Sequence, residues 1–170
     1  MSFTVALLIT AFAPSALFAT AASNTAEESR FVSVFTAICL ENMGDPKGQE
    51  TAAAQPPLAF SRGSNSDDGL EEYLSGPFRL GINAEGKQCT LTYELGADSN
   101  LDSVIAAMSA AIGTDQGQQL EEPDSRYWLI AGPADEEFVL AIKVAEKGKR
   151  LATLWMQRRS TLQQSNNEAN

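Results

Sequence analysis

The sequence predicts an α+β protein in which a five-stranded antiparallel sheet carries two main helices on one face. Two segments alternate apolar and polar residues with a period of two, as half-buried strands do, at residues 78–82 and 89–95. Three further strands are predicted at residues 126–131, 138–145 and 151–158, which short turn-forming segments separate. Two further segments repeat apolar residues at the helical period. The connectors between consecutive strands are short, so the pairing must be antiparallel, because a parallel neighbour needs a crossover of about a dozen residues. A disulfide between Cys39 and Cys89 would join the first helix to the second strand.

The N-terminal segment has the composition of a secretory signal peptide. No charged side chain precedes Glu27, and the apolar core is interrupted by Pro14. This core is shorter than the ~20 apolar residues of a membrane span, and Ala19-Thr20-Ala21 provides the small residues of a cleavage site. Only the terminal amine supplies positive charge ahead of the core. We expect cleavage after Ala21 or Ala22, which removes residues 1–22; a hydrophobic anchor that stays attached is the alternative.

The first helix is predicted over residues 27–41, with Thr25 as its N-cap and Gly44 beyond its end. Its apolar face consists of residues at helical spacing, namely Phe31, Val34, Phe35, Ile38 and Cys39. Asp45-Pro46 combines an N-cap with a proline at the first helical position, which predicts a short second helix through Ala54. A helix is also predicted over residues 101–112, whose apolar stripe comprises Leu101, Val104, Ile105, Met108 and Ile112, with Ser99 or Asn100 as N-cap and Gly113 just past the end.

The remaining segments are predicted as turns, loops and a tail. Residues 61–69 are rich in Ser, Gly, Asn and Asp, so we expect a mobile surface loop there. Residues 83–86 have the composition of a hairpin turn, and residues 116–125 that of a polar loop. The Gln- and Asn-rich residues 161–170 should form a disordered polar tail. A single α+β domain is therefore expected over residues 23–160.

Composition excludes several classes of function. The 170 residues include no His, which removes Ser-His-Asp and Cys-His nucleophiles, His-ligated zinc and imidazole bases. The excess of 22 acidic over 12 basic residues gives a formal charge of -10, which disfavours nucleic acid as a partner. No Gly-x-Ser-x-Gly elbow, phosphate loop, Ser-x-x-Lys or dinucleotide fingerprint is present. We therefore predict a non-enzymatic protein with no catalytic residues, no metal and no cofactor.

Cys39 and Cys89 are the only cysteines. In an exported protein an even count favours a structural disulfide over thiol catalysis or metal binding. A redox role would more naturally use a Cys-x-x-Cys pair, and this spacing is absent.

Acidic clusters are one class of candidate interaction surface. Asp67 and Asp68 lie in the first polar loop, where carboxylate oxygens suit calcium; because the EF-hand spacing is not met, a solvated loop is the expectation. Asp135 and Glu136, followed by Glu137, lie at a predicted turn. There they either face water or converge with other carboxylates for acid/base chemistry.

Aromatic residues are the second class of candidate surface. Tyr127, Trp128 and Trp155 fall on strands that should be close neighbours, where they either bind sugars or peptides or pack in the core. Adjacent residues on a strand face opposite sides, so Tyr127 or Trp128 must lie away from the helices. Half of the basic residues fall between Lys143 and Arg159, a positive patch that either orients a partner or protects exposed strands from aggregation.

Two segments resemble small exported bacterial proteins without an assigned function, FVSVFTAICL at residues 31–40 and GKQCTL at residues 86–91. The resemblance covers only the first helix and the Cys-bearing strand; it implies a similar fold and disulfide and brings no catalytic residues. Ser75-Gly76-Pro77-Phe78 is similar to the Ser-Gly loop of periplasmic lysozyme inhibitors, and the rest of that motif is absent.

These observations predict an exported protein, periplasmic or extracellular and not membrane-spanning after cleavage, that binds another protein or a cell-envelope component. The alternative is an inhibitor or immunity-type protein that neutralises a cationic envelope hydrolase through acidic loops. A hydrolase that works without His is a third hypothesis.

Overall fold

The computed structural model describes residues 18–67, 69–96, 99, 101–114, 118–119, 124–146 and 148–161. Its elements, in chain order, are α1 (Phe18–Phe35), the π-helical turn η1 (Thr36–Leu40), α2 (Pro46–Ala54), β1 (Ser61–Asp67), β2 (Leu70–Ser75), β3 (Phe78–Asn83), β4 (Gln88–Glu94), α3 (Leu101–Ile112), β5 (Gln118–Gln119), β6 (Ser125–Ala131), the 3₁₀ turn η2 (Pro133–Asp135), β7 (Glu137–Glu146) and β8 (Arg150–Arg158). The fold is α+β, as predicted.

The strands form one antiparallel sheet in the order β1-β2-β3-β4-β8-β7-β6-β5. All five predicted strands are present, but the predicted number is wrong, because β1, β2 and the two-residue β5 also belong to the sheet. Hairpins connect β1 through β4, and a second meander runs from β5 back to β8, which pairs with β4 at the centre. The strand alternation and short connectors had predicted the antiparallel arrangement correctly.

The segment 61–69 is not the loop that its composition suggested, because most of it forms β1 and pairs with β2. An edge strand needs backbone partners on one side only, so it can form without the apolar alternation that marks the inner strands. Polar side chains and the register shift between Arg62 and Ser66 suit an edge that must not pair with another sheet. Similarly, β5 lies within the predicted loop 116–125, while residues 116, 117 and 120–123 lie outside the described part of the chain.

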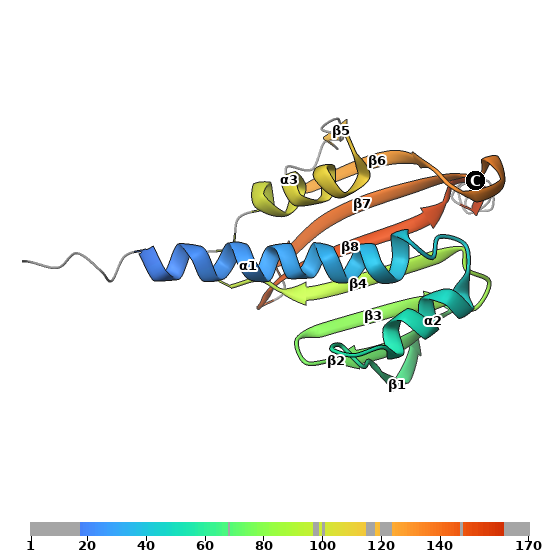
Figure 1. Cartoon of the computed structure of the whole chain (residues 1–170), viewed down its shortest axis with the longest axis horizontal. Helices are drawn as coiled ribbons and strands as arrows, with labels where there is room; N and C mark the ends of the chain where they lie inside the picture. The colour runs from blue at the N-terminus through green and yellow to red at the C-terminus, as the bar shows by residue number, and fades with distance from the viewer. Residues whose placement is uncertain are drawn as a thin grey trace, which may run out of the picture.

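The helices α1, α2 and α3 all cross the same side of the sheet (Figure 1). A single cluster of buried residues joins them to the strands. It includes Phe31, Phe35 and Ile38 from the first helical segment, Ala53 from α2, Val104 and Met108 from α3, and Leu80, Leu91, Leu140, Ile142 and Leu154 from the sheet. The predicted packing of helices on one face is therefore present, with the core between the helix layer and the sheet.

The first helix begins and ends earlier than residues 27–41. It starts at Phe18, so Thr25 lies inside it and is not its N-cap. The Ala-rich residues before Glu27 explain the extension, since each added residue of good helix propensity gains one backbone hydrogen bond. At the other end the helix widens into η1, where the Glu41 amide bonds the Thr36 carbonyl at 3.0 Å. The first 17 residues of the expected leader lie outside the described part of the chain, as do residues 162–170 of the expected tail.

The shorter helices and a hairpin turn match the sequence prediction. Asp45 caps α2 through its side chain, which accepts a hydrogen bond from the Lys47 amide at 3.1 Å, and Pro46 is the first helical residue. Gly113 follows α3 with a φ of +73°, a conformation that glycine adopts at little cost. The turn between β3 and β4 is closed by a hydrogen bond from the Gly86 amide to the Asn83 carbonyl at 2.8 Å.

The predicted disulfide is present and lies in the core. Cys39 in η1 and Cys89 in β4 are joined, with their Cα atoms 5.8 Å apart and both residues completely buried. In the sheet, Cys89 lies directly opposite Ile82 on β3 and Met156 on β8. The bridge therefore attaches the C-terminal end of the first helical segment to the middle of the sheet.

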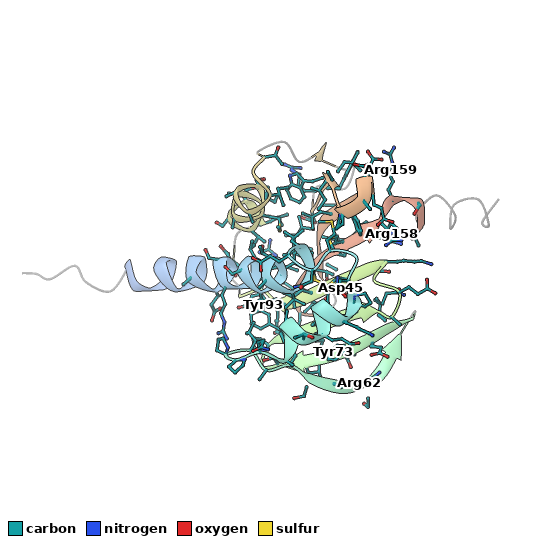
Figure 2. All side chains as sticks on the ribbon, turned by 45° about the vertical axis from the view of Figure 1, so that its right-hand side comes forward. Asp45, Arg62, Tyr73, Tyr93, Arg158 and Arg159 are labelled. Carbon is teal, nitrogen blue, oxygen red and sulfur yellow. A yellow bond between two sulfur atoms is a disulfide. The ribbon has the colours of Figure 1, made fainter. Side chains whose placement is uncertain are left out.

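Tyr93 provides a second attachment between α1 and β4. Its hydroxyl donates a hydrogen bond to Glu27 Oε2 at 2.6 Å, and its ring packs between Phe31 and Phe78 with centroid distances of 5.6 and 5.4 Å. Figure 2 shows Tyr93 beneath the helix. Burial, followed by the hydrogen bond to Glu27, raises the pKa of Tyr93 to about 12.

We predict that replacing both cysteines with alanine lowers the free energy of unfolding by about 4 kcal/mol, because the bridge closes a segment with a sequence separation of 50 residues. Urea unfolding of the double variant and of the reduced wild-type protein measures the loss. Equal stability of the oxidised and reduced wild-type protein would contradict the structural role assigned to the bridge.

We also predict that stability falls as the pH rises from about 10 to about 12. In this window folded Tyr93 keeps its proton while the unfolded chain loses it at its ordinary pKa of 10.0, so deprotonation favours unfolding. Tyr73, whose pKa burial also raises to about 12, acts in the same direction. Urea unfolding at about pH 9 and about pH 11 should show a smaller fall for Tyr93→Phe than for the wild-type protein. An equal fall in both proteins excludes Tyr93 as a source of the effect.

Candidate functional site

The face of the sheet opposite the helices is the candidate site, and we call it the open face. Successive side chains on a strand alternate between faces, so the residues between the core positions of β2–β4 and β6–β8 belong to it. Prominent members are Glu72, Leu74, Arg79, Gly81, Thr90, Thr92, Tyr127, Leu129, Ala141, Lys143, Thr153 and Trp155. Two large apolar side chains of this face are exposed, Leu74 by 40% and Leu129 by 52%.

The strand registers align one row of residues across the open face. From β2 to β6 the directly opposite residues are Glu72, Gly81, Thr90, Trp155, Ala141 and Tyr127. Ala141 faces away from the helices and is nevertheless only 2% exposed. Trp155 and Tyr127 are its direct cross-strand neighbours, and directly opposite side chains of this size are within contact range of the alanine. At this end of the row, Trp155 and Tyr127 lie on either side of the small Ala141, and we call these two aromatic residues the aromatic platform.

A hollow of about 390 Å³ lies at the other end of this row, and we call it the Gly81 hollow. Its lining consists of Leu70, Glu72, Arg79, Leu80, Gly81, Thr90 and Thr92. The glycine is essential to its shape, because a Cβ atom at position 81 would lie 2.5 Å from Thr90 Oγ1. Trp155 is directly opposite Thr90 in the register, so the aromatic platform adjoins the hollow.

The polar groups of the Gly81 hollow are balanced in charge. Arg79 Nη1 lies 3.6 Å from Glu72 Oε1, and the arginine side chain is much more exposed than the carboxylate. Hydroxyl groups supply the rest of the polarity, with Thr92 Oγ1 3.1 Å from Thr153 Oγ1 on the neighbouring strand. The hollow therefore offers a guanidinium, a carboxylate and hydroxyls without a net charge.

The acidic turn with Asp135 and Glu136 forms a separate hollow of about 480 Å³ with the end of β8. Glu136 Oε2 lies 3.1 Å from Arg158 Nη2, and Glu137 Oε2 lies 2.5 Å from Arg159 Nη1. Figure 2 shows the two arginines together at one end of the molecule, away from Tyr73. Asp135 itself is exposed and has a φ of +59°. The turn is thus largely neutralised by the chain's own arginines and is not a concentrated acidic surface.

The structure separates the other predicted surface residues. Trp128 is 2% exposed and lies in the core, whereas Trp155 is partly exposed on the open face. The expectation that Tyr127 and Trp128 face opposite sides is confirmed. The side chain of Asp67 and the whole of Asp68 lie outside the described part of the chain.

Sequence reasoning missed the residues that make the Gly81 hollow. The sequence predicts Gly81, Thr90 and Thr92 only as members of strands, and no motif links Glu72 with Arg79. One signal was available, because a glycine inside an alternating strand often marks a close approach or a missing wall. Cross-strand neighbours, by contrast, are not visible in a sequence.

The chain was compared with protein-family models, with curated proteins and with solved structures, and no match was found. Among the described residues no group of three or more His, Cys, Asp or Glu side chains is placed to hold a metal ion. In the same part of the chain no helix is long and apolar enough to cross a membrane. The single carboxylate of the Gly81 hollow is paired with Arg79, so the arrangement is suited to binding a ligand.

We predict that the two tryptophans differ in access to solvent. In Trp128→Phe the remaining Trp155 fluorescence should be quenched by acrylamide several times more strongly than that of Trp128 in Trp155→Phe, because Trp128 is 2% exposed. Stern–Volmer plots of the two single-tryptophan variants measure the ratio. Equal quenching in both would contradict the placement of Trp155, partly exposed, on the open face.

Proposed function

We propose that this chain is a non-enzymatic exported protein, periplasmic or extracellular, that binds a component of the cell envelope through its open face. The observation that carries the proposal is the row across this face, in which the Gly81 hollow adjoins the platform of Trp155 and Tyr127. An aromatic surface beside a recess with a few polar groups is typical of ligand sites.

Export is supported by two independent features. The N-terminal segment has the composition of a cleaved leader. The only two cysteines form a completely buried disulfide, and structural disulfides persist mainly in oxidising compartments outside the cytoplasm.

Binding is favoured over catalysis by the chemistry of the open face. The chain has no His, and the carboxylate and guanidinium of the Gly81 hollow are paired with each other. Thr90 and Thr92 line the hollow, and a threonine hydroxyl needs an adjacent base to become a nucleophile. The same groups serve directly as hydrogen-bond donors and acceptors.

The inhibitor alternative depends on acidic loops that meet a cationic hydrolase. Glu136 and Glu137 are paired with Arg158 and Arg159, so this turn has little free negative charge to offer. The overall charge of -10 still attracts basic proteins. Salt sensitivity distinguishes the two functions, because charge-driven association weakens steeply with ionic strength.

We predict that the protein, purified after export from expression of the full chain, co-sediments with isolated cell-envelope material. Trp155→Ala should reduce the bound fraction about tenfold, because it removes the larger ring of the platform, the one that lies next to the Gly81 hollow. Ser33→Ala, an exposed change on the helix side, is the control and should bind as the wild-type protein does. Binding that is indifferent to Trp155 but abolished by salt, together with a basic hydrolase in the pellet, would replace the proposal by the inhibitor alternative.

A further inference from the structure

Resting on the proposed function, we infer that the ligand of the open face is a neutral glycan, with one sugar ring in the Gly81 hollow and the adjoining part of the chain on Trp155. The volume of about 390 Å³ agrees with this, since small-molecule sites commonly measure about 300 to 1,000 Å³. The recess accommodates a sugar ring but not a folded domain.

The charge of the site selects a neutral ligand. Arg79 and Glu72 lie 3.6 Å apart and offset each other, so neither an anion nor a cation gains a free counter-charge there. The protein's overall charge of -10 adds repulsion for anionic ligands. A neutral ligand meets neither a desolvated unpaired charge nor long-range repulsion.

The polar groups match the hydroxyls of a sugar. The Thr90 hydroxyl can both donate and accept, the Thr92 hydroxyl keeps part of this capacity beside its hydrogen bond with Thr153, Glu72 accepts, and Arg79 donates. A pyranose carries both functions on every hydroxyl around its rim, so it can satisfy these groups in one plane. The apolar lining, by contrast, is limited to Leu70 and the buried Leu80, too little for a lipid chain.

Trp155 supplies the apolar part of the interaction. The faces of a sugar ring consist of C–H groups, which pack on an aromatic ring while the hydroxyls stay directed to polar partners. Trp155 lies directly opposite Thr90, so a glycan can extend from the Gly81 hollow onto the indole along the residue row.

A peptide fits this surface less well. The backbone groups of the central strands are already paired within the sheet, so a peptide laid across the open face gains no backbone ladder. Its amide groups would have to find partners among short hydroxyl side chains, and each buried amide left without one costs binding energy.

The test uses Trp155 as its own reporter. The Trp128→Phe variant contains one tryptophan, and a soluble β-1,4-linked oligomer of N-acetylglucosamine is titrated into it while Trp155 emission is followed. Saturable change in emission and protection from acrylamide are expected. A cellulose oligomer of equal length tests tolerance of the sugar type, and an oligogalacturonate of equal length, which carries carboxylates, should bind at least about tenfold more weakly.

Three variants locate the site. Thr90→Val keeps the shape of the side chain and removes one hydroxyl, which should weaken binding about three- to tenfold. Gly81→Ala fills the recess and should weaken it more strongly, while Ser33→Ala, an exposed change on the helix side of the sheet, should leave it unchanged. Thermal unfolding confirms that each variant is folded, and Thr90→Val serves if Gly81→Ala is not.

The outcomes separate this inference from the function on which it rests. One outcome is that envelope material binds in a Trp155-dependent manner while no neutral oligomer changes Trp155 emission at millimolar concentration. In that case the inference of a glycan ligand is wrong, and the open face is retained as the binding site. Equal binding by Thr90→Val, Gly81→Ala and the wild-type protein would exclude the Gly81 hollow as the binding site. If neither envelope material nor oligomers bind, both proposals fail.

Discussion

The disulfide between Cys39 and Cys89 is the constraint on which the arrangement of this protein depends. It joins the widened end of the first helical segment to a central strand at a point where both residues are completely buried. Tyr93, on the same strand, contacts Glu27 nearer the start of that segment. Two attachments along one helix hold it across the sheet, and the core forms beneath it. The open face of the same sheet lies on the side away from the described helices.

The side chains of the open face limit the size of its exposed apolar patches. An exposed sheet face with a large apolar patch is a liability, and here small residues, hydroxyls and charges interrupt the apolar side chains. Gly81 and Ala141 have small or no side chains, whereas their neighbours in the residue row include the large side chains of Trp155 and Tyr127. The same alternation that limits nonspecific association produces a recess next to a platform. The shape of a sheet surface thus depends on the sizes of side chains that are neighbours across strands.

The acidity of the chain is less local than its sequence implies. Carboxylates of the sheet pair with nearby cations, as Glu71 does with Arg62, Glu94 with Lys149, and Glu136 with Arg158. Exposed pairs of this kind contribute little to stability, typically less than about 1 kcal/mol each. Their larger effect is on recognition, because they reduce the free negative charge at each turn. The net charge of -10 is therefore spread over the molecule and not concentrated at one of these turns.

The sequence alone determined the strands with clean alternation, the helix over residues 101–112 and, through an even cysteine count, the disulfide. These features are local or follow from counting, so their physics is contained in short windows of the chain. It did not reveal β1, whose residues are all polar or glycine, or β2, whose apolar residues do not alternate regularly with polar ones. Nor did it reveal the site, since Gly81, Thr90 and Trp155 become neighbours only through strand register. Register is decided by long-range packing of the core, which only the tertiary structure contains.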